Sequence, residues 1–158
     1  MMQSNVSNGI LNNWLELANI GAAINHRLEE ALKEEPGLSL NEFYVLHFLS
    51  LNDEKKLRLQ QLQERVGLSQ SALSRLVVRM EAPRCGALRR NVCEDDRRGV
   101  YTEMTELGAD KLERGRRIVE QVLEAAVRSG ELPAELQSFM SRGAVGNAGS
   151  EGNAGNAE

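Results

Sequence analysis

The chain has 158 residues, of which 41% are apolar and 27% charged, and these values are typical of a soluble globular protein with one ordinary core. No apolar stretch approaches the roughly 20 residues of a membrane helix, and the first residues lack the features of a secretory signal, so we expect a cytoplasmic protein with no membrane contact. The two cysteines, Cys85 and Cys93, give no disulfide framework and agree with a reducing compartment.

Positive charge is concentrated in one segment of a chain whose net charge is -4. From Lys55 to Tyr101 there are 11 Lys and Arg residues against 5 Asp and Glu residues, whereas the remainder holds 8 basic and 18 acidic residues. This distribution is expected of a surface that faces phosphates. A solvated charged face explains the charge alone equally well.

The first predicted helix runs from Gly9 to about Lys33 and follows a polar, frayed segment of residues 1–8. Its apolar residues recur at spacings of three and four and form two stripes, which indicates burial on more than one side. We therefore expect this helix to pack against a partner chain and to end at Pro36 and Gly37.

A second helix is predicted to begin after Ser39, because Ser39 and Glu42 have capping-box spacing before an apolar face. The polar residues 52–56 should then form a turn. Residues 57–59 alternate between apolar and charged side chains, and this pattern predicts a short strand that could pair with a later one.

Residues 60–66 are predicted to form a helix of two turns, which ends at Gly67 because glycine accepts the backbone of a tight turn. Ser69 has the side chain of a good N-cap, and the helix that it starts should continue from residue 70 to about residue 82. The pattern is that of a helix-turn-helix.

The outward face of this second helix has the composition of a nucleic-acid contact. Short polar residues in its first turn would let the backbone approach the floor of a groove, and Arg75 and Arg79 could reach phosphates or guanine edges. A solvated helix face is the alternative interpretation. The outward residues are Gln70, Ser71, Ser74, Arg75, Val78 and Arg79.

Two short strands are predicted at residues 87–92 and 99–104, and together they would form a hairpin. The hairpin carries the basic pair Arg89 and Arg90. This pair favours a wing that contacts DNA over the alternative of a charged surface hairpin.

The turn between these strands holds two acids and two arginines. Carboxylates near DNA are repelled by phosphate unless they are paired, so we expect Asp96 to hold an arginine, most simply Arg98, by a charge-assisted hydrogen bond. Arg97 or Arg98 would then enter the minor groove, whose narrow regions attract arginine.

Thr105 is predicted to cap a long helix that reaches about Arg128, and Pro133 should start a short helix. From residue 142 onward the sequence consists mainly of Gly, Ala, Asn and Ser. This composition predicts a disordered tail.

Three motifs resemble the multiple-antibiotic-resistance regulator (MarR) family. They are residues 68–76 (LSQSALSRL), residues 96–100 (DRRGV) and residues 104–108 (MTELG), where Met104 replaces the family's usual leucine. The resemblance covers about residues 9–140. One departure is the connection of residues 82–87, which is longer than the family's single-glycine turn and predicts a different approach angle for the wing.

From the resemblance we expect a mainly α fold with a small β-hairpin wing, that is, a winged helix-turn-helix DNA-binding lobe plus a helical dimerisation region. The implied parts are an N-terminal dimerisation helix (9–35), the winged lobe (38–105), C-terminal dimerisation helices (106–141) and a disordered tail (142–158). The implied function is transcription regulation by a homodimer at a pseudo-palindromic double-stranded DNA operator, as a repressor relieved by a small aromatic ligand or an oxidant.

The predicted sites follow from these motifs and from the resemblance. Asp96 is expected to hold the wing arginine in place. The expected DNA-binding residues are Ser69, Gln70, Ser71, Ser74, Arg75, Arg79, Arg89, Arg90, Arg97 and Arg98. A ligand pocket, suggested by the family, would involve Trp14, Leu17, Tyr44, His47 and Phe48, although plain core residues explain these positions equally well.

No catalytic constellation, cofactor motif or metal-ligand spacing is recognisable, so an enzyme is not expected. The cysteines are interpreted as structural, although Arg84 and Arg89 could activate a lone thiol. The alternative function is a winged-helix module that binds protein and has no specific DNA target. Such a module would show little salt dependence, whereas DNA binding weakens steeply as salt rises.

Overall fold

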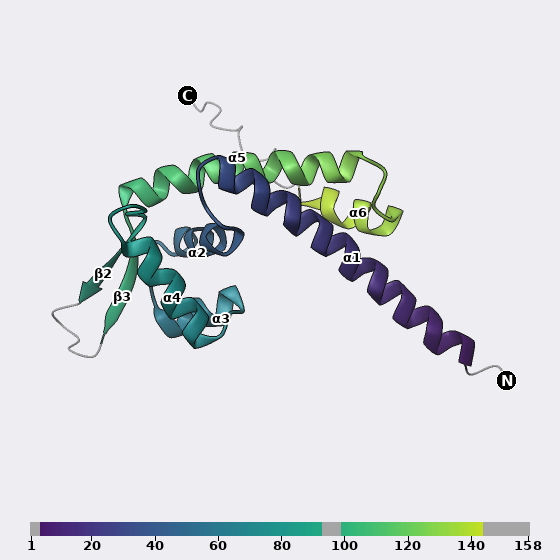
Figure 1. Cartoon of the computed structure of the whole chain (residues 1–158), viewed down its shortest axis with the longest axis horizontal. Coiled ribbons are helices and arrows are strands. Elements are labelled where there is room, and N and C mark those ends of the chain that lie inside the picture. Colours follow the sequence, from purple (N-terminus) through teal and green to yellow (C-terminus); the bar gives the residue numbers. More distant parts are fainter. Residues whose placement is uncertain (1–3, 93–98, 144–158) are drawn as a thin grey trace, which may run out of the picture. The chain divides into compact units, whose positions relative to one another are not determined.

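The computed structural model describes residues 4–92 and 99–143, and the side chains from residue 9 onward within those ranges. Asp96, Arg97, Arg98, Cys93 and residues 144–158 lie outside the described residues. In chain order, the elements are α1 (Ser4–Glu34), α2 (Leu40–Ser50), β1 (Lys56–Arg58), α3 (Leu59–Val66), α4 (Gln70–Glu81), β2 (Leu88–Val92), β3 (Val100–Met104), α5 (Glu106–Arg128) and α6 (Ala134–Arg142), and Figure 1 labels all of them except β1.

The chain forms two compact units. The central unit comprises residues 25–120, and the terminal unit comprises residues 1–24 and 121–158. The fold is mainly helical with a small three-stranded antiparallel sheet, as the sequence predicts. Among the described residues, no helix combines the length and the apolar character that are needed to cross a membrane.

In the central unit, α2 starts where the sequence predicts. The Ser39 hydroxyl oxygen accepts the backbone N–H of Glu42 at 3.1 Å, and the Glu29 carboxylate accepts the backbone N–H of Leu40 at 2.8 Å. Two of the N–H groups that a helix start leaves without intrahelical partners are thereby satisfied. Because Glu29 belongs to α1, the second bond fixes the end of α1 beside the start of α2.

The helix-turn-helix consists of α3 and α4 and agrees closely with the prediction. Gly67 ends α3 at a φ of +76°, a backbone conformation that favours glycine. The Ser69 hydroxyl oxygen caps α4 by accepting the backbone N–H of Ala72 at 3.2 Å. The inward side chains of α4 are buried in the core of the lobe, namely Leu73, Leu76, Val77 and Met80.

The three strands form a sheet in the order β1-β3-β2. The predicted early strand is confirmed as β1, although Leu59 begins α3 instead of extending the strand. The register sets Leu57 opposite Thr102 and Leu88 opposite Met104, and these four side chains are buried on the inner face. In Figure 1, α4 lies beside the hairpin, and α3 packs on α4.

Residues 82–87 connect α4 to the wing by a turn whose ends are held by hydrogen bonds. The backbone N–H of Ala87 donates to the Met80 carbonyl at 3.0 Å, and the Ala87 carbonyl accepts the N–H of Thr105 at 3.0 Å. The Thr105 hydroxyl donates to the Gly86 carbonyl at 2.6 Å and accepts the N–H of Gly108 at 3.0 Å, which caps α5 as predicted. The Thr105 hydroxyl therefore connects the turn before β2, here called the root of the wing, to the first turn of α5.

In the terminal unit, α1 begins at Ser4, five residues before the predicted start. It leaves large apolar side chains uncovered, and α6 has no buried residue. The uncovered side chains include Ile10, Leu11, Trp14, Leu15, Leu17 and, in α6, Phe139.

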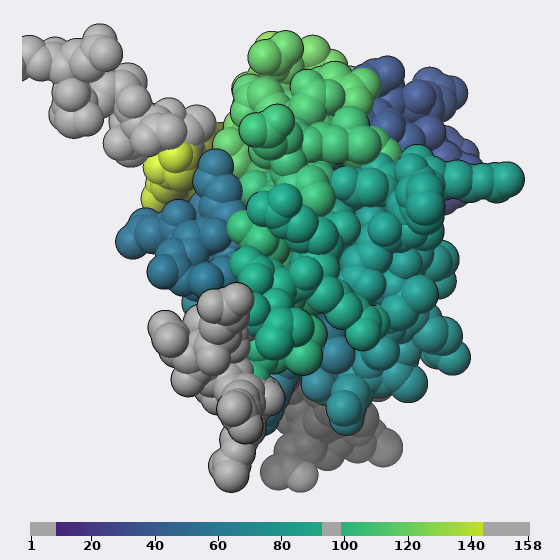
Figure 2. Space-filling model, turned by 90° about the vertical axis from the view of Figure 1, so that its left-hand side faces the viewer, coloured from purple at the N-terminus to yellow at the C-terminus, as the bar shows by residue number. Residues whose placement is uncertain are grey.

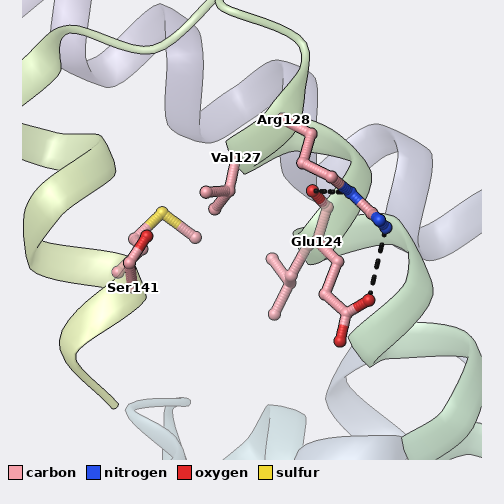
Figure 3. Close-up of a pocket in the computed structure, with 6 residues that line it drawn as sticks. Glu124, Val127, Arg128 and Ser141 are labelled. Carbon is pink, nitrogen blue, oxygen red and sulfur yellow. Dashed lines mark hydrogen bonds and ion pairs between the residues drawn. The ribbon is translucent and has the colours of Figure 1, made fainter. Parts of the chain in front are cut away.

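Within the terminal unit, α5 and α6 line an apolar hollow of about 370 Å³. Figure 3 shows Val127 and Ser141 on its two sides and the ion pair between Arg128 and Glu124 beside it.

Candidate nucleic-acid interface

The outward face of α4 is open. Gln70, Ser71, Arg75, Val78 and Arg79 are exposed, which confirms the predicted orientation of the helix, and Ser74 is half-buried. Ser74, Arg75, Val78 and Arg79 line a shallow hollow of about 360 Å³ on this face. In Figure 2 the teal surface of α4 and β2 adjoins the green surface of β3 and the start of α5. Ser69 is occupied as the N-cap, and its hydroxyl lies 3.5 Å from that of Ser71.

Arg75 and Arg79 differ from most arginines of the described chain. Within the described residues, neither forms a hydrogen bond or an ion pair, whereas Arg89, Arg90, Arg114, Arg116, Arg117 and Arg128 each lie within ion-pair distance of a carboxylate. A guanidinium that the protein does not neutralise keeps its full charge and its five N–H donors for a ligand. The α4 face is thus a cationic surface with short polar side chains at its start.

Arg89 and Arg90, both predicted to bind DNA, are each held by a carboxylate of the lobe. Nε of Arg89 lies 3.0 Å from a Glu103 oxygen across the strand pair, and Nε of Arg90 lies 3.1 Å from both oxygens of Glu81 at the end of α4. The second pair ties β2 of the wing to the end of α4. Since only the Nε atoms appear in these contacts, the terminal guanidinium nitrogens can still donate to a phosphate.

The Arg89 pair shifts the titration of both partners. The hydrogen bond from Arg89 lowers the pKa of Glu103, and the amide of Asn91, 3.1 Å from the same carboxylate oxygen, lowers it further. The hydrogen bond to Glu103 raises the pKa of Arg89 in turn. Both groups therefore stay charged throughout the physiological range.

We expect the variant Glu103→Gln to lose stability in a pH-dependent way. Because the pKa of Glu103 is lowered by folding, its carboxylate stabilises the folded state above the unfolded pKa, and this contribution disappears as pH falls through the folded value. At pH 7 the loss should be small, since the Arg89 side chain is exposed and water screens its pair with Glu103. Urea unfolding from pH 7 down to about pH 3 should show that the free energies of unfolding of the two proteins become equal as the pH falls. A constant difference would contradict the assignment, and Glu64→Gln, at an exposed carboxylate of α3, is the control.

The outer face of the sheet carries a cluster that the sequence interpretation missed. Nζ of Lys56 and the guanidinium carbon of Arg58 lie 5.3 Å and 5.4 Å from the centre of the Tyr101 ring, and Arg58 donates to the Tyr101 hydroxyl at 3.3 Å. Each of these contacts is a cation–π or hydrogen-bond interaction that stiffens the wing. The cluster forms because the register of β1 and β3 sets Arg58 opposite Tyr101, and this register could not be read from the sequence.

A second missed feature is a group of glutamines at the start of α4 and on the adjoining α3. Gln60 and Gln63 of α3 and Gln70 of α4 line a hollow of about 430 Å³ together with Leu59. Glutamine amides both donate and accept hydrogen bonds, as adenine edges require. Of the three, only Gln70 is among the residues predicted from the sequence.

The structure brings together part of the predicted ligand pocket. Tyr44 and His47 line a hollow of about 260 Å³, whose other lining residues are Phe43, Arg116, Val119 and Glu120. Burial and then the charge of Arg116 lower the pKa of His47, and burial raises the pKa of Tyr44. Phe48 is half-buried, with its ring 5.5 Å from that of His47.

The other two predicted pocket residues belong to the terminal unit. Trp14 is exposed, and Leu17 lines a separate hollow there with Asn13, Glu16, Ile20, Pro133, Glu135 and Leu136.

Nε2 of His26 lies 3.3 Å from Glu30 on the surface of α1. Cys85 is half-buried, with Nζ of Lys111 3.8 Å from its sulfur. Across residues 4–92 and 99–143, no three His, Cys, Asp or Glu side chains are grouped to hold a metal ion.

Comparison with known proteins agrees with this architecture. Residues 37–99 match the family model described as the MarR family. The structure is similar to that of Sco3205, a MarR family transcriptional regulator from Streptomyces coelicolor in complex with DNA, with 23% identity, a TM-score of 0.71, and coverage of 85% of this chain and 82% of that one. No curated protein matches the sequence.

Two further solved structures are similar. AbsC, a MarR family transcriptional regulator from S. coelicolor, shows 27% identity and a TM-score of 0.65, with 84% of this chain and 87% of AbsC covered. The organohalide-sensing transcriptional regulator RdhR-CbdbA1625, in its 2,4-dichlorophenol-bound form, shows 20% identity and a TM-score of 0.66, with 84% and 75% covered. The matches extend over both the winged lobe and the flanking helices.

Proposed function

Because residues 37–99 match the MarR family model and the fold is similar to that of MarR family regulators, we propose that this chain is a transcription regulator that binds a double-stranded DNA operator as a homodimer, most simply as a repressor. In this proposal α4 enters the major groove and the wing lies along the adjacent minor groove. Binding, without catalysis, is the activity.

The main support for the proposal is that the arginine side chains on the α4 face are not neutralised by nearby carboxylates. Arg75 and Arg79 have no partner within the described residues, while Glu81 at the end of α4 and Glu103 of β3 form ion pairs with Arg90 and Arg89. A surface whose carboxylates are masked and whose guanidinium groups are open attracts a polyanion despite the net charge of -4. Sco3205, which shares the fold, is described in complex with DNA.

A second copy of the chain is proposed as the partner of the terminal unit. Ile10, Leu11, Trp14 and Leu15 of α1 are between 49% and 68% exposed, and a stable surface rarely leaves so many large apolar side chains in water. Two copies related by a two-fold axis would present two α4 helices to half-sites about 34 Å apart. The operator would then be a pseudo-palindrome.

The effector is proposed to be a small aromatic anion. Aromatic walls from Phe43, Tyr44 and His47 suit a ring, and the guanidinium of Arg116 suits a carboxylate or phenolate. The similar regulator RdhR-CbdbA1625 is described with bound 2,4-dichlorophenol. Phe48 remains a candidate for this site, as do Asp96, Arg97 and Arg98 for the wing tip.

The test is selection of duplexes from a random DNA pool by the full chain, followed by fluorescence anisotropy at several salt concentrations. We expect enrichment of a two-fold symmetric sequence and a steep loss of affinity with salt, about a thousandfold or more between 50 and 200 mM if six or more phosphates are contacted. No enrichment, together with a flat salt response, would favour the alternative of a protein-binding winged helix.

A further inference from the structure

Val78 is the exception among the apolar residues of α4. It is 51% exposed, whereas Leu73, Leu76, Val77 and Met80 are at most 4% exposed. Valine is not a favoured residue on an exposed helix surface, because its branched Cβ loses rotamer freedom in a helix. Its presence on this face has no explanation in the packing of the described residues.

The neighbours of Val78 distinguish it from an isolated apolar residue on a surface. Ser74 and Arg75 precede it by one helical turn, Arg79 follows it, and all four side chains line the hollow of about 360 Å³. The valine is therefore the apolar element of a face that otherwise offers hydroxyl and guanidinium groups. A ligand that fits this face needs one apolar group next to hydrogen-bond acceptors.

The major groove offers this combination where a G·C base pair lies next to an A·T base pair. Guanine presents two acceptors to an arginine, and thymine presents the C5-methyl group, the apolar feature on the floor of the groove. Residues three apart on a helix are separated by about 4.5 Å along its axis, close to the roughly 3.4 Å between base pairs. Arg75 and Val78 can therefore address neighbouring base pairs.

Resting on the proposed function, we propose that Val78 determines operator specificity by packing on the methyl group of a thymine, next to a base pair read by Arg75 or Arg79. Each half-site of the operator then contains a thymine that the protein distinguishes from uracil. The contact is apolar, so its contribution does not depend on salt, in contrast to that of the arginines.

The test removes the C5-methyl group of thymine from the DNA and, separately, the two methyl groups of Val78 from the protein. The duplex enriched from the random pool is synthesised with each thymine in turn replaced by deoxyuridine, which lacks only the C5-methyl group. We expect one thymine per half-site at which this change weakens binding of the unaltered chain about fourfold, the effect of losing one buried methyl group. The variant Val78→Ala should bind the thymine and uracil duplexes of that position equally well.

The control variant is Leu51→Ala, which truncates an apolar residue that is 60% exposed at the end of α2, away from the α4 face. It should discriminate uracil as the unaltered chain does. Val78→Ala should keep the fold, because alanine favours a helix and the Val78 side chain is 51% exposed. Circular dichroism of both variants verifies this.

The outcomes separate the two proposals. If a duplex is enriched but Val78→Ala still discriminates uracil at every position as the unaltered chain does, Val78 is not the reader and only the present inference is overturned. If no duplex is enriched at all, the proposed function fails and this inference fails with it. A loss of uracil discrimination at one position per half-site supports both.

Discussion

The double variant Arg75→Ala/Arg79→Ala is expected to bind the operator at least about 30-fold more weakly than the unaltered chain, a loss of about 2 kcal/mol or more. Both guanidinium groups lie on the open face of α4 and lack partners in the described protein, so their removal should leave the fold unchanged while it removes two proposed DNA contacts. Fluorescence anisotropy with the selected duplex at fixed salt measures the loss.

Two further variants make this result specific. Arg117→Ala removes one positive charge from an exposed residue of α5 that pairs with Glu113, and it should change the affinity less than twofold. Arg75→Lys keeps the charge but not the planar pair of donors. If Arg75 reads a guanine, lysine should restore little of the affinity, and if it contacts only phosphate, lysine should restore most. Equal, negligible losses in the alanine variants would show that α4 is not the reading helix.

The variant Gly108→Ala is expected to be the most destabilising small substitution in the lobe, by about 3 kcal/mol or more. A Cβ atom at this position would lie 2.2 Å from the carbonyl oxygen of Ala87, and this neighbour is backbone that rotamer changes cannot move. Either the connection to the wing or the first turn of α5 must shift. Thermal and urea unfolding, followed by circular dichroism, measure the change.

Gly9→Ala is the matched control, because a Cβ atom at Gly9 would meet nothing within 4 Å. This glycine lies within α1, so alanine should leave stability unchanged or raise it slightly through its higher helix propensity. If both variants unfolded alike, the close approach of α5 to Ala87 would not be important for the stability of the lobe.

Local patterns were sufficient to predict the recognition helix. Ser69 caps α4, Gly67 takes a positive φ, and the apolar spacing separates the buried from the exposed side of the helix, since each of these signals acts within a few residues. The family resemblance supported the same assignment, and the family match to residues 37–99 covers it.

Features that depend on distant partners were not predictable in the same way. The sequence marks Arg89 and Arg90 as basic, but only the folded lobe brings Glu103 and Glu81 to their side chains. Likewise Arg116 of α5 and His47 of α2 line the same hollow although they are almost 70 positions apart in the sequence. The start of α1 was misplaced because polar residues 4–8 carry no periodic apolar signal, yet they continue the helix.

The hydroxyl of Thr105 has a consequence for how the lobe opens. It donates to the carbonyl of Gly86 and accepts from the N–H of Gly108, so a displacement of this side chain disturbs both bonds. Unwinding of the first turn of α5 and release of the wing root are thus one cooperative event, in the sense of a shared local unfolding unit. Since α5 continues without a break from Glu106 to Arg128, a rotation of the helix about its own axis turns this hydroxyl and thereby acts directly on the root of the wing.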